Sequence, residues 1–328
     1  MSIDVDRFDQ NSRPGQDSRP DRTAAASAAA ASGAASPGTS TRPTMGEQWP
    51  VADFASNGFA VIDAGVSPQQ LDQLRAEGLA VCRGERGPFE GLLPVPPGTT
   101  DEEVLRSYLC IHHPHKISDK LAQAMRLPAV VDALVQLIGP DIKSMQSMFF
   151  IKSEHKPGQA WHQDEYFIPT RDRSLTAAWI ALDDATTDNG CLWVLPGSHR
   201  DGIIYPDREQ DDDRFDCTDE AYDFPWSDDD AVPVQVPAGS VVLFNGYLLH
   251  RSLPNNGRRG FRRAFVSHYM SATSLLPWML PIPEGVHLGK HDFRDIELIA
   301  GRDPYAYKGT EQLLAPMVRP SGEGGCAR

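Results

Sequence analysis

After residue 141 the chain is made of short apolar runs separated by turn residues, and this pattern limits the fold more than any other feature of the sequence. The runs are rich in β-branched and aromatic residues, as strands are. They cover residues 145–152, 177–182, 191–195, 232–236, 241–244 and 263–269. Strands do not alternate with helices and no glycine-rich phosphate loop occurs, which excludes a nucleotide-binding α/β fold. The pattern predicts a mainly β protein with flanking helices and an antiparallel double-sheet jelly roll, or a related barrel, at its core.

The part of the chain before residue 141 has a different pattern, which predicts helices. Residues 67–81 begin with a serine in an N-cap position, continue with Pro68, and carry apolar residues at helical spacing. Residues 127–137 repeat this design and end at Gly139-Pro140. Residues 54–63 are expected to form a turn at Asn57-Gly58 and then a short strand.

The first 45 residues contrast with the rest because alanine, serine, glycine and proline dominate them. Such a segment has too little apolar surface to offset the entropy lost on ordering, so residues 1–45 are expected to be a disordered tail. The tail lacks the apolar stretch of a signal peptide. Residues 46–328 suit a single domain, with a helical part at 46–140, a jelly-roll core at about 141–275 and a C-terminal extension at 276–328.

Charge and cysteine content limit the partners and the compartment. The formal net charge of -14 repels phosphate backbones and anionic membrane surfaces, so neither a nucleic acid nor a membrane is expected as a partner. The five cysteines are scattered without a CxxC pair, and we expect them to be reduced thiols in a cytoplasmic protein. A homodimer is left open, because no sequence feature bears on it.

The stretch with the most chemical content is Trp161-His162-Gln163-Asp164. In an extended chain His162 and Asp164 point to the same side, so an imidazole and a carboxylate can bind one cation together. A second imidazole would complete the two-histidine, one-carboxylate face of non-haem Fe(II) oxygenases. Alone the pair is weak evidence, because a chain with 10 histidines and 45 acidic residues produces it by chance.

The best candidate for the second imidazole is His250, which follows the apolar run 241–244 and is expected at the end of a later strand. A lone histidine in such a place is more often structural. Arg262 and Arg263 follow near a strand start, where a guanidinium that points into a barrel binds a carboxylate through two hydrogen bonds. An oxygenase of this type needs a two-electron co-substrate such as 2-oxoglutarate. Either arginine fits its distal carboxylate, with Ser252 as an added hydroxyl donor.

In their order along the chain, these motifs resemble those of the phytanoyl-CoA dioxygenase (PhyH) family of Fe(II)/2-oxoglutarate-dependent oxygenases. The resemblance spans about residues 50–275 and implies a double-stranded β-helix core, that is, a cupin-like jelly roll. The matching segments are 161–164 (WHQD), 178–182 (AWIAL), 189–192 (NGCL), 195–199 (LPGSH), 239–244 (GSVVLF), 250–252 (HRS) and 262–264 (RRA).

The resemblance assigns roles to individual residues. It implies that His162, Asp164 and His250 are the iron ligands. The residues it implies around 2-oxoglutarate are Arg262, with Arg263 as the alternative, Ser252, Trp179, Lys152 and Gln146. Met148 and Lys116 are weaker matches, and His199 is interpreted as structural. Each co-substrate residue also has an ordinary interpretation, such as a core aromatic side chain or a charge at a strand end.

The resemblance implies a dioxygenase that hydroxylates an aliphatic C–H bond with O₂ and releases succinate and CO₂. Asp164 stands where related halogenases have a glycine or alanine that leaves room for chloride, so hydroxylation is favoured over halogenation. The acidic net charge argues against a CoA thioester as the substrate and favours a small molecule, such as a secondary metabolite or an amino-acid derivative. Two alternatives remain, a zinc-dependent hydrolase with the same His/Asp/His site and a non-catalytic jelly roll that binds a ligand.

Residues 207–230 form an acidic insert with interleaved aromatic residues. Runs of like charge usually lie in water, so a solvated loop is the simpler interpretation. The alternative is a lid over a cationic substrate, because the insert lies between the segments that carry the expected metal ligands. The spacing does not match a calcium-binding EF-hand loop.

Overall fold

The computed structural model describes residues 51–275 and 295–319. All of these residues belong to one compact unit. The predicted disordered tail, 1–45, lies outside the described residues, as do 276–294 and 320–328 of the predicted C-terminal extension. Among the described residues, no helix combines the length and the apolar character needed to cross a membrane.

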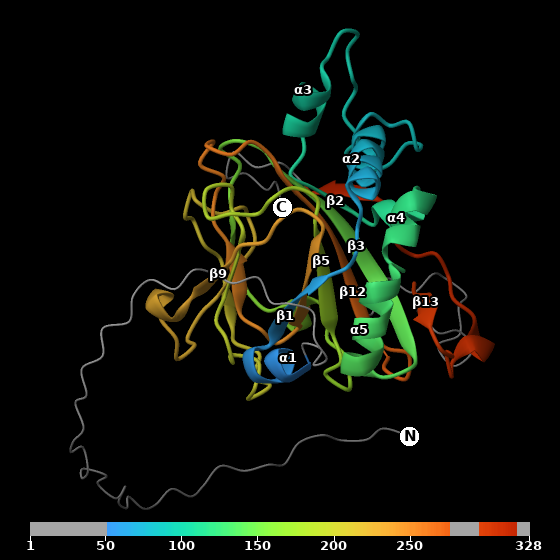
Figure 1. The fold of residues 1–328 in the computed structure, drawn as a ribbon, viewed down its shortest axis with the longest axis vertical. Coiled ribbons are helices and arrows are strands. Elements are labelled where there is room, and N and C mark those ends of the chain that lie inside the picture. Colours follow the sequence, from blue (N-terminus) through green and yellow to red (C-terminus); the bar gives the residue numbers. More distant parts are fainter. Residues whose placement is uncertain (1–50, 276–294, 320–328) are drawn as a thin grey trace, which may run out of the picture. The chain divides into compact units, whose positions relative to one another are not determined.

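The largest element is an antiparallel sheet of eight strands, which crosses the centre of Figure 1. Its strands in spatial order are β1 (Phe59–Asp63), β10 (Ser240–Asn245), β5 (Thr176–Ala181), β12 (Arg262–Ser271), β3 (Ile142–Lys152), β2 (Cys110–His112) and β14 (Met317–Arg319), while β13 (Glu297–Ala300) pairs with β3 off this path. The predicted runs 145–152, 177–182, 241–244 and 263–269 thus became β3, β5, β10 and β12, which confirms them as strands.

A second antiparallel sheet lies opposite the first, toward the left of Figure 1. Its strands in order are β4 (Gln159–His162), β11 (His250–Ser252), β6 (Leu192–Val194) and β9 (Val232–Val234). The two facing sheets confirm the predicted mainly β fold with a jelly-roll core. The sequence pattern did not predict β4 and β11 as strands, because they are short and carry polar residues.

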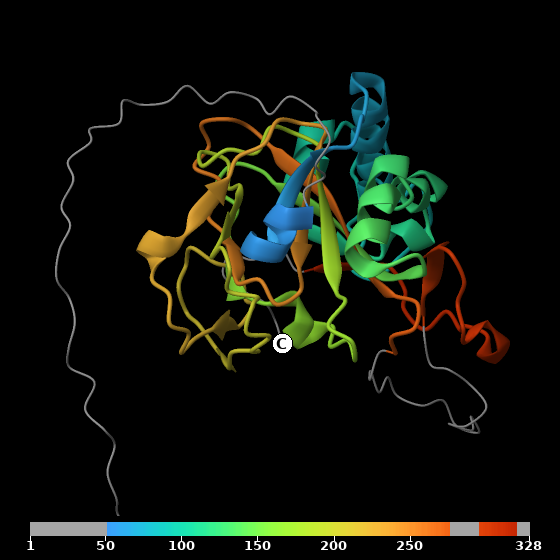
Figure 2. The same cartoon turned by 60° about the horizontal axis from the view of Figure 1, so that its bottom comes forward.

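Helices cover the outer face of the large sheet, on the side away from β9 (Figures 1 and 2). The helices of the described residues are α1 (Val51–Asn57), α2 (Pro68–Cys82), α3 (Asp101–Arg106), α4 (Asp119–Ala124), α5 (Pro128–Ile138) and α6 (Asp164–Phe167). The helices predicted at 67–81 and 127–137 are confirmed as α2 and α5. Ser67 caps α2 by accepting a hydrogen bond from the Gln70 amide, as a capping box requires. The prediction of a turn around Asn57-Gly58 was incomplete, because this turn ends helix α1.

Two apolar layers lie on the two faces of the large sheet. Phe149 of β3 packs in the outer layer against the helices, and its ring fills the space next to Gly78 of α2, where an added Cβ would lie 2.0 Å from the ring. Met148, the preceding residue, belongs to the inner layer between the sheets together with Trp179 and Val266. This alternation follows from the two-residue period of a strand, and it places the inner layer around the candidate site.

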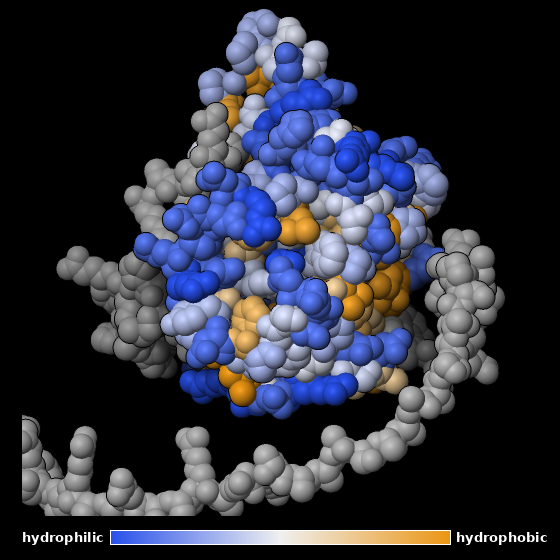
Figure 3. All heavy atoms as spheres, turned by 90° about the vertical axis from the view of Figure 1, so that its left-hand side faces the viewer, coloured by the Kyte–Doolittle hydropathy of each residue, from blue (hydrophilic) through white to orange (hydrophobic). Residues whose placement is uncertain are grey.

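The acidic insert folds against the small sheet. It contains a short hairpin of β7 (Asp207–Arg208) and β8 (Glu220–Ala221) and a 3₁₀ turn, η2 (Asp228–Asp230). Gly158, just before β4, exchanges backbone hydrogen bonds with Arg214 and Asp216 at 2.7 and 2.9 Å. The side of the molecule that faces left in Figure 1 is mainly hydrophilic with small separate apolar patches (Figure 3).

One prediction about the cysteines was wrong. Cys217 of the insert takes part in a disulfide, whereas Cys82, Cys110 and Cys191 are free and buried, and Cys326 lies outside the described residues. Sequence spacing alone could not reveal this bond, because the fold decides which thiols come together.

Two further 3₁₀ turns complete the described structure. They are η1 (Pro114–Lys116), which follows β2, and η3 (Ala306–Lys308), which lies between β13 and β14.

Candidate metal centre and co-substrate cavity

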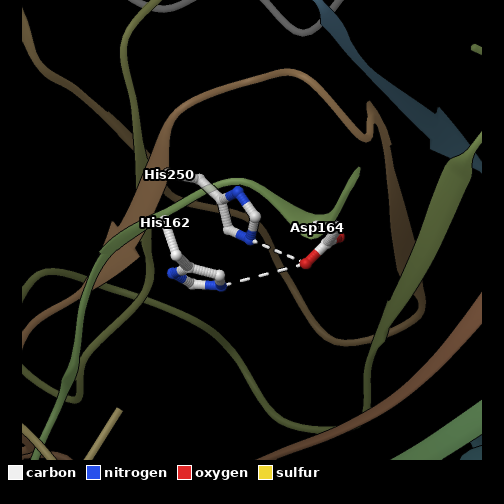
Figure 4. Close-up of side chains that lie close together, drawn as sticks. All are labelled: His162, Asp164 and His250. Atoms are coloured by element: carbon white, nitrogen blue, oxygen red, sulfur yellow. Dashed lines mark ion pairs between the residues drawn. The ribbon is translucent and has the colours of Figure 1, made fainter. Parts of the chain in front are cut away.

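The three predicted metal ligands meet at one point between the two sheets. His162 is the last residue of β4, and His250 is the first residue of β11, not the end of a strand as expected. The two histidines are direct partners in the β4–β11 register, and their ring centroids lie 4.0 Å apart. Asp164 opens helix α6 two residues after His162, and its carboxylate faces both rings (Figure 4).

The geometry of the three side chains suits one metal ion. Oδ1 of Asp164 lies 3.9 Å from Nε2 of His162 and 3.7 Å from Nε2 of His250. The three ligand atoms lie within 4.8 Å of one another, and all three residues are buried. The described residues therefore contain a His/Asp/His triad that is able to bind a metal, with the ligand set of non-haem Fe(II) oxygenases.

Backbone carbonyls fix the tautomer of both imidazoles. Nδ1 of His162 lies 2.8 Å from the Ala160 oxygen, and Nδ1 of His250 lies 2.9 Å from the Leu248 oxygen. Each Nδ1 therefore carries the hydrogen, which leaves the lone pair of Nε2 directed toward the metal position. Burial and the neighbouring His250 lower the pKa of His162 to about 3, so this ring is neutral, as a metal ligand must be.

Gln163, between the two ligands, holds the backbone in the required shape. Its backbone is extended, with φ -126° and ψ 128°, so its side chain points away from the metal position. The amide group donates to the carbonyl oxygens of Ile203 and Tyr247 at 2.9 and 2.7 Å and accepts from the Tyr205 amide at 2.9 Å. These three hydrogen bonds anchor the turn that sets His162 and Asp164 side by side.

His268 of β12 is a site residue that the sequence reasoning missed. Its Nε2 lies 3.0 Å from Oδ2 of Asp164, the carboxylate oxygen that does not face the two histidines. Burial acts to raise the pKa of Asp164, but His268 and His250 hold it below its usual range. The sequence did contain a signal for His268. It follows Arg262 by an even number of residues in the same strand, so both side chains are expected on the same strand face.

A cavity lined by polar and apolar side chains adjoins the triad. Its apolar wall comes from the inner layer. The residues that line it include Met148, Trp179, Ser252, Arg262, Val266 and His268.

Arg262 is a buried cation that has no carboxylate partner among the described residues. It is 3% exposed, its Nε has no hydrogen-bond partner, and its guanidinium lies 5.6 Å from the ring centre of Trp179. Burial lowers the pKa of Arg262 to about 10, so the group stays charged at neutral pH. The next residue, Arg263, points to the other face, where Asp183 accepts two hydrogen bonds from its guanidinium at 2.8 Å.

Lys152 lies behind the cavity wall and does not line the cavity. It is the register partner of Arg262, and its Nζ donates to Oγ of Ser252 at 2.9 Å and to the Leu253 oxygen at 2.7 Å. Burial and the Arg262 charge hold the pKa of Lys152 well below its ordinary value. Arg262 lines the cavity, and Lys152 lies next to it on the paired strand. The part of the cavity beside these two buried basic groups therefore fits an anionic group such as the distal carboxylate of 2-oxoglutarate.

The remaining predicted positions lie around this centre. Gln146 is half-buried on β3 opposite His268 but does not line the cavity, whereas Met148 does. Lys116 forms an ion pair with Asp295 and also lies outside the lining. His199 lies 3.2 Å from the Ala55 oxygen of α1, in keeping with a structural role.

Comparison with known proteins identifies relatives of this chain. A family model described as phytanoyl-CoA dioxygenase (PhyH) matches residues 54–264. Phytanoyl-CoA dioxygenase domain-containing protein 1 of Bos taurus is 30% identical over 246 residues, which cover 66% of this chain and 79% of that protein. The solved structure of apo ThoJ, a non-heme monooxygenase, has a TM-score of 0.58 at 19% identity and covers 82% of this chain and 87% of that chain.

A second solved structure, CytC3 with Fe(II) and alpha-ketoglutarate, has a TM-score of 0.51 at 20% identity and covers 80% of this chain and 91% of that chain. At this identity the structural likeness supports the jelly-roll fold, and the family match carries the enzyme class. The predicted enzyme class, a 2-oxoglutarate-dependent dioxygenase, and the predicted cofactors, Fe(II) and 2-oxoglutarate, are confirmed. The chain belongs to the phytanoyl-CoA dioxygenase (PhyH) family.

Proposed function

We propose that this non-haem oxygenase hydroxylates an aliphatic C–H bond of a small-molecule substrate. The reaction would consume one O₂ and one 2-oxoglutarate, place one oxygen atom in the product alcohol, and release succinate and CO₂. The observation that carries the proposal is the Asp164 carboxylate, which faces both histidines and is held by His268.

His162, His250 and Asp164 would hold Fe(II) through Nε2, Nε2 and Oδ1. When bound, Fe(II) and 2-oxoglutarate together would supply the electrons that reduce and so activate O₂. The protein would contribute orientation, because Ala160 and Leu248 fix the two rings through their carbonyl oxygens. The burial of all three ligands would keep bulk water from the reacting atoms.

The co-substrate would lie in the cavity with its distal carboxylate on Arg262. That guanidinium is buried and lacks a carboxylate partner among the described residues, so an incoming carboxylate would satisfy it. Ser252 would add a hydroxyl hydrogen bond, since Lys152 donates to its oxygen and so leaves the hydroxyl hydrogen free to point into the cavity. Trp179 would pack along the carbon chain. Gln146 remains a weaker candidate, because it stands beside His268 but outside the lining.

The carboxylate of Asp164 also favours hydroxylation over halogenation. A halide needs an open position on the metal, and a side chain that occupies that position as a ligand leaves none for it. The substrate proposed here is a secondary metabolite or an amino-acid-like molecule. The net charge of -14 argues against the phosphate groups of a CoA thioester, although the family name refers to such a substrate.

The buried Arg262 bears on both alternatives, a zinc-dependent hydrolase and a ligand-binding jelly roll without catalysis. The unpaired guanidinium fits the distal carboxylate of 2-oxoglutarate, a co-substrate that a zinc hydrolase does not require. A protein that only binds a ligand would not need a metal-binding triad next to the guanidinium of Arg262.

The deciding experiment measures succinate formation. The protein is loaded anaerobically with Fe(II), given 2-oxoglutarate and O₂, and screened against metabolite pools. Stimulated succinate release and a product heavier by one oxygen atom are expected, even with excess chloride present. His162→Ala and Asp164→Ala should both abolish turnover. A species that is active with Zn(II) and indifferent to 2-oxoglutarate would favour the hydrolase instead.

A further inference from the structure

One carboxylate of the acidic insert contacts both strands that carry the metal histidines. Oδ1 of Asp228 accepts a hydrogen bond from Nε1 of Trp161 at 3.2 Å and lies 2.9 Å from Nη1 of Arg251. Trp161 immediately precedes His162 on β4, and Arg251 immediately follows His250 on β11. Asp228 therefore bridges the two strands at the level of the metal centre.

The bridge lies on the outer face of the small sheet. Neighbouring residues of a strand point to opposite faces, so the side chains of Trp161 and Arg251 point outward where those of His162 and His250 point inward, although Arg251 also borders the cavity. The guanidinium of Arg251 lies 4.5 Å from the ring centre of Trp161, a cation–π distance. Indole, guanidinium and carboxylate thus form one closed cluster behind the two imidazoles.

The members of this cluster differ in burial, and Asp228 is the exposed one. The Arg251 side chain is 9% exposed, whereas that of Asp228 is 67% exposed. Among the described residues, Asp228 is the carboxylate that pairs with this buried guanidinium, and Nε of Arg251 has no hydrogen-bond partner. Loss of the carboxylate would leave a buried cation with its π contact alone, which favours movement of Arg251 and of the strand beneath it.

The rest of the insert supports the same contact. Phe224 packs edge-on to Trp161 with 6.3 Å between ring centres, and Trp226 packs against Tyr205 at 6.0 Å. These rings belong to an apolar cluster on the outer face of β4 and β11 that also contains Ala221 and Leu249. The residues 214–216 cover the otherwise open edge of β4 through Gly158. The insert is therefore docked on the metal-bearing strands.

We propose that Asp228 is a positioning residue for the metal centre, which ties the outer faces of β4 and β11 together and so supports the strand pairing that sets the separation of His162 and His250. The proposal deepens the proposed function, since it rests on the same metal site. It assigns the acidic insert a bracing role in place of the two interpretations from the sequence, a solvated loop or a substrate lid.

The test compares neighbouring aspartates of the same 3₁₀ turn. Asp228→Ala and the control Asp229→Ala remove the same charge from exposed positions of one acidic run. Co(II) binding to the full-length protein is measured anaerobically by calorimetry, and the visible d–d spectrum of the bound Co(II) is recorded. We expect the Co(II) Kd to rise about 3- to 10-fold in Asp228→Ala with an altered spectrum, below the 10- to 100-fold effect of a direct contact to a ligand. Asp229→Ala should stay within about twofold of the wild type.

A second pair of variants separates positioning from general stability. Trp161→Phe keeps a ring under Arg251 but removes the indole donor, and Asp228→Asn keeps an acceptor oxygen but removes the charge. Both should give Co(II) affinities between those of the wild type and Asp228→Ala. Equal Kd values and equal spectra for Asp228→Ala, Asp228→Asn and Asp229→Ala would overturn the proposal, even with a lowered melting temperature. A wild-type protein that binds no Co(II) would instead overturn the metal site itself.

Discussion

His162 and His250 face each other as register partners on β4 and β11, with 4.0 Å between their ring centroids, although 87 residues separate them in the chain (163 to 249). The pairing of two short strands therefore determines the spacing of the two candidate metal ligands. Asp164 is held relative to His162 by local backbone geometry, and His250 is held by sheet pairing.

His268 should be needed to orient Asp164. His268→Ala removes the hydrogen bond to Oδ2 and frees the carboxylate to rotate, so we expect Co(II) affinity to fall about 10-fold. His268→Gln keeps an N–H donor at a similar reach and should recover part of the loss. Calorimetric Co(II) titration of the metal-free protein measures both variants. An unchanged Kd in His268→Ala would show that the carboxylate is held by other contacts.

Arg262 and Arg263 should differ in their effect on 2-oxoglutarate. Arg262→Met removes the buried guanidinium of the cavity, so the KM for 2-oxoglutarate should rise about 30-fold or more, as for loss of a buried charge partner. Arg263→Met breaks the pair with Asp183 outside the cavity and should lower stability with little change in KM. Steady-state kinetics of 2-oxoglutarate consumption decides between them. A larger rise of the KM for 2-oxoglutarate in Arg263→Met than in Arg262→Met would mean that Arg263 binds the distal carboxylate instead.

Metal binding should stabilise the folded protein through the triad. A ligand that binds the native state at 100 times its Kd adds about 2.7 kcal/mol of stability, so Ni(II) or Co(II) should raise the melting temperature measurably. The shift should disappear after treatment with a chelator and should be absent in His162→Ala and His250→Ala. His199→Ala is the control, because this histidine contacts α1 and should leave the metal-induced shift unchanged. A full shift in His162→Ala would place the metal elsewhere.

Glu77 of α2 should give the protein a distinct acid dependence. Hydrogen bonds, the one from Arg86 first and that from Ser118 after it, lower the pKa of Glu77 from 4.5 to about 2. The folded-state pKa is below the unfolded one, so the carboxylate stabilises the fold above about pH 4.5. This contribution is lost as the pH falls toward 2. Glu77→Gln should therefore lower the free energy of unfolding at pH 7 by about 2 to 3 kcal/mol, and the difference should shrink at pH 3.

Urea unfolding at pH 7 and pH 3 measures this difference. Glu102→Gln is the control, since its carboxylate is 67% exposed and pairs only with Arg106 among the described residues. It should change the free energy of unfolding by less than about 0.5 kcal/mol. A pH-independent difference for Glu77→Gln would mean that packing, and not the charge, accounts for the effect.

Several elements of the site could be predicted because they depend on local rules. The long strands β3, β5, β10 and β12 follow from β-branched and aromatic runs between turns. His162 and Asp164 share a side because Gln163 is extended, which is the ordinary state of a chain leaving a strand. Helix α2 follows from Ser67 and Pro68 at its start.

The short strands could not be predicted from their residues. β11 reads His250-Arg251-Ser252, which has no apolar alternation, and it becomes a strand because β4 and β6 pair with it on both sides. The insert escaped prediction for a related reason. Its carboxylates suggest a solvated run, but its aromatic rings and Asp228 find partners on strands that are distant in the sequence.

The sequence by itself determined the three candidate metal ligands, the strand that carries Arg262 and Arg263, and the family, because these depend on residue type and order. Only the tertiary structure decided which of the two arginines faces the cavity. Successive residues of a strand point to opposite faces, and the pairing of β12 with β3 and β5 fixes which face is inward. The tertiary structure also brought His268 to Asp164 and Asp228 to the backs of β4 and β11, since such contacts arise only when distant segments are packed together.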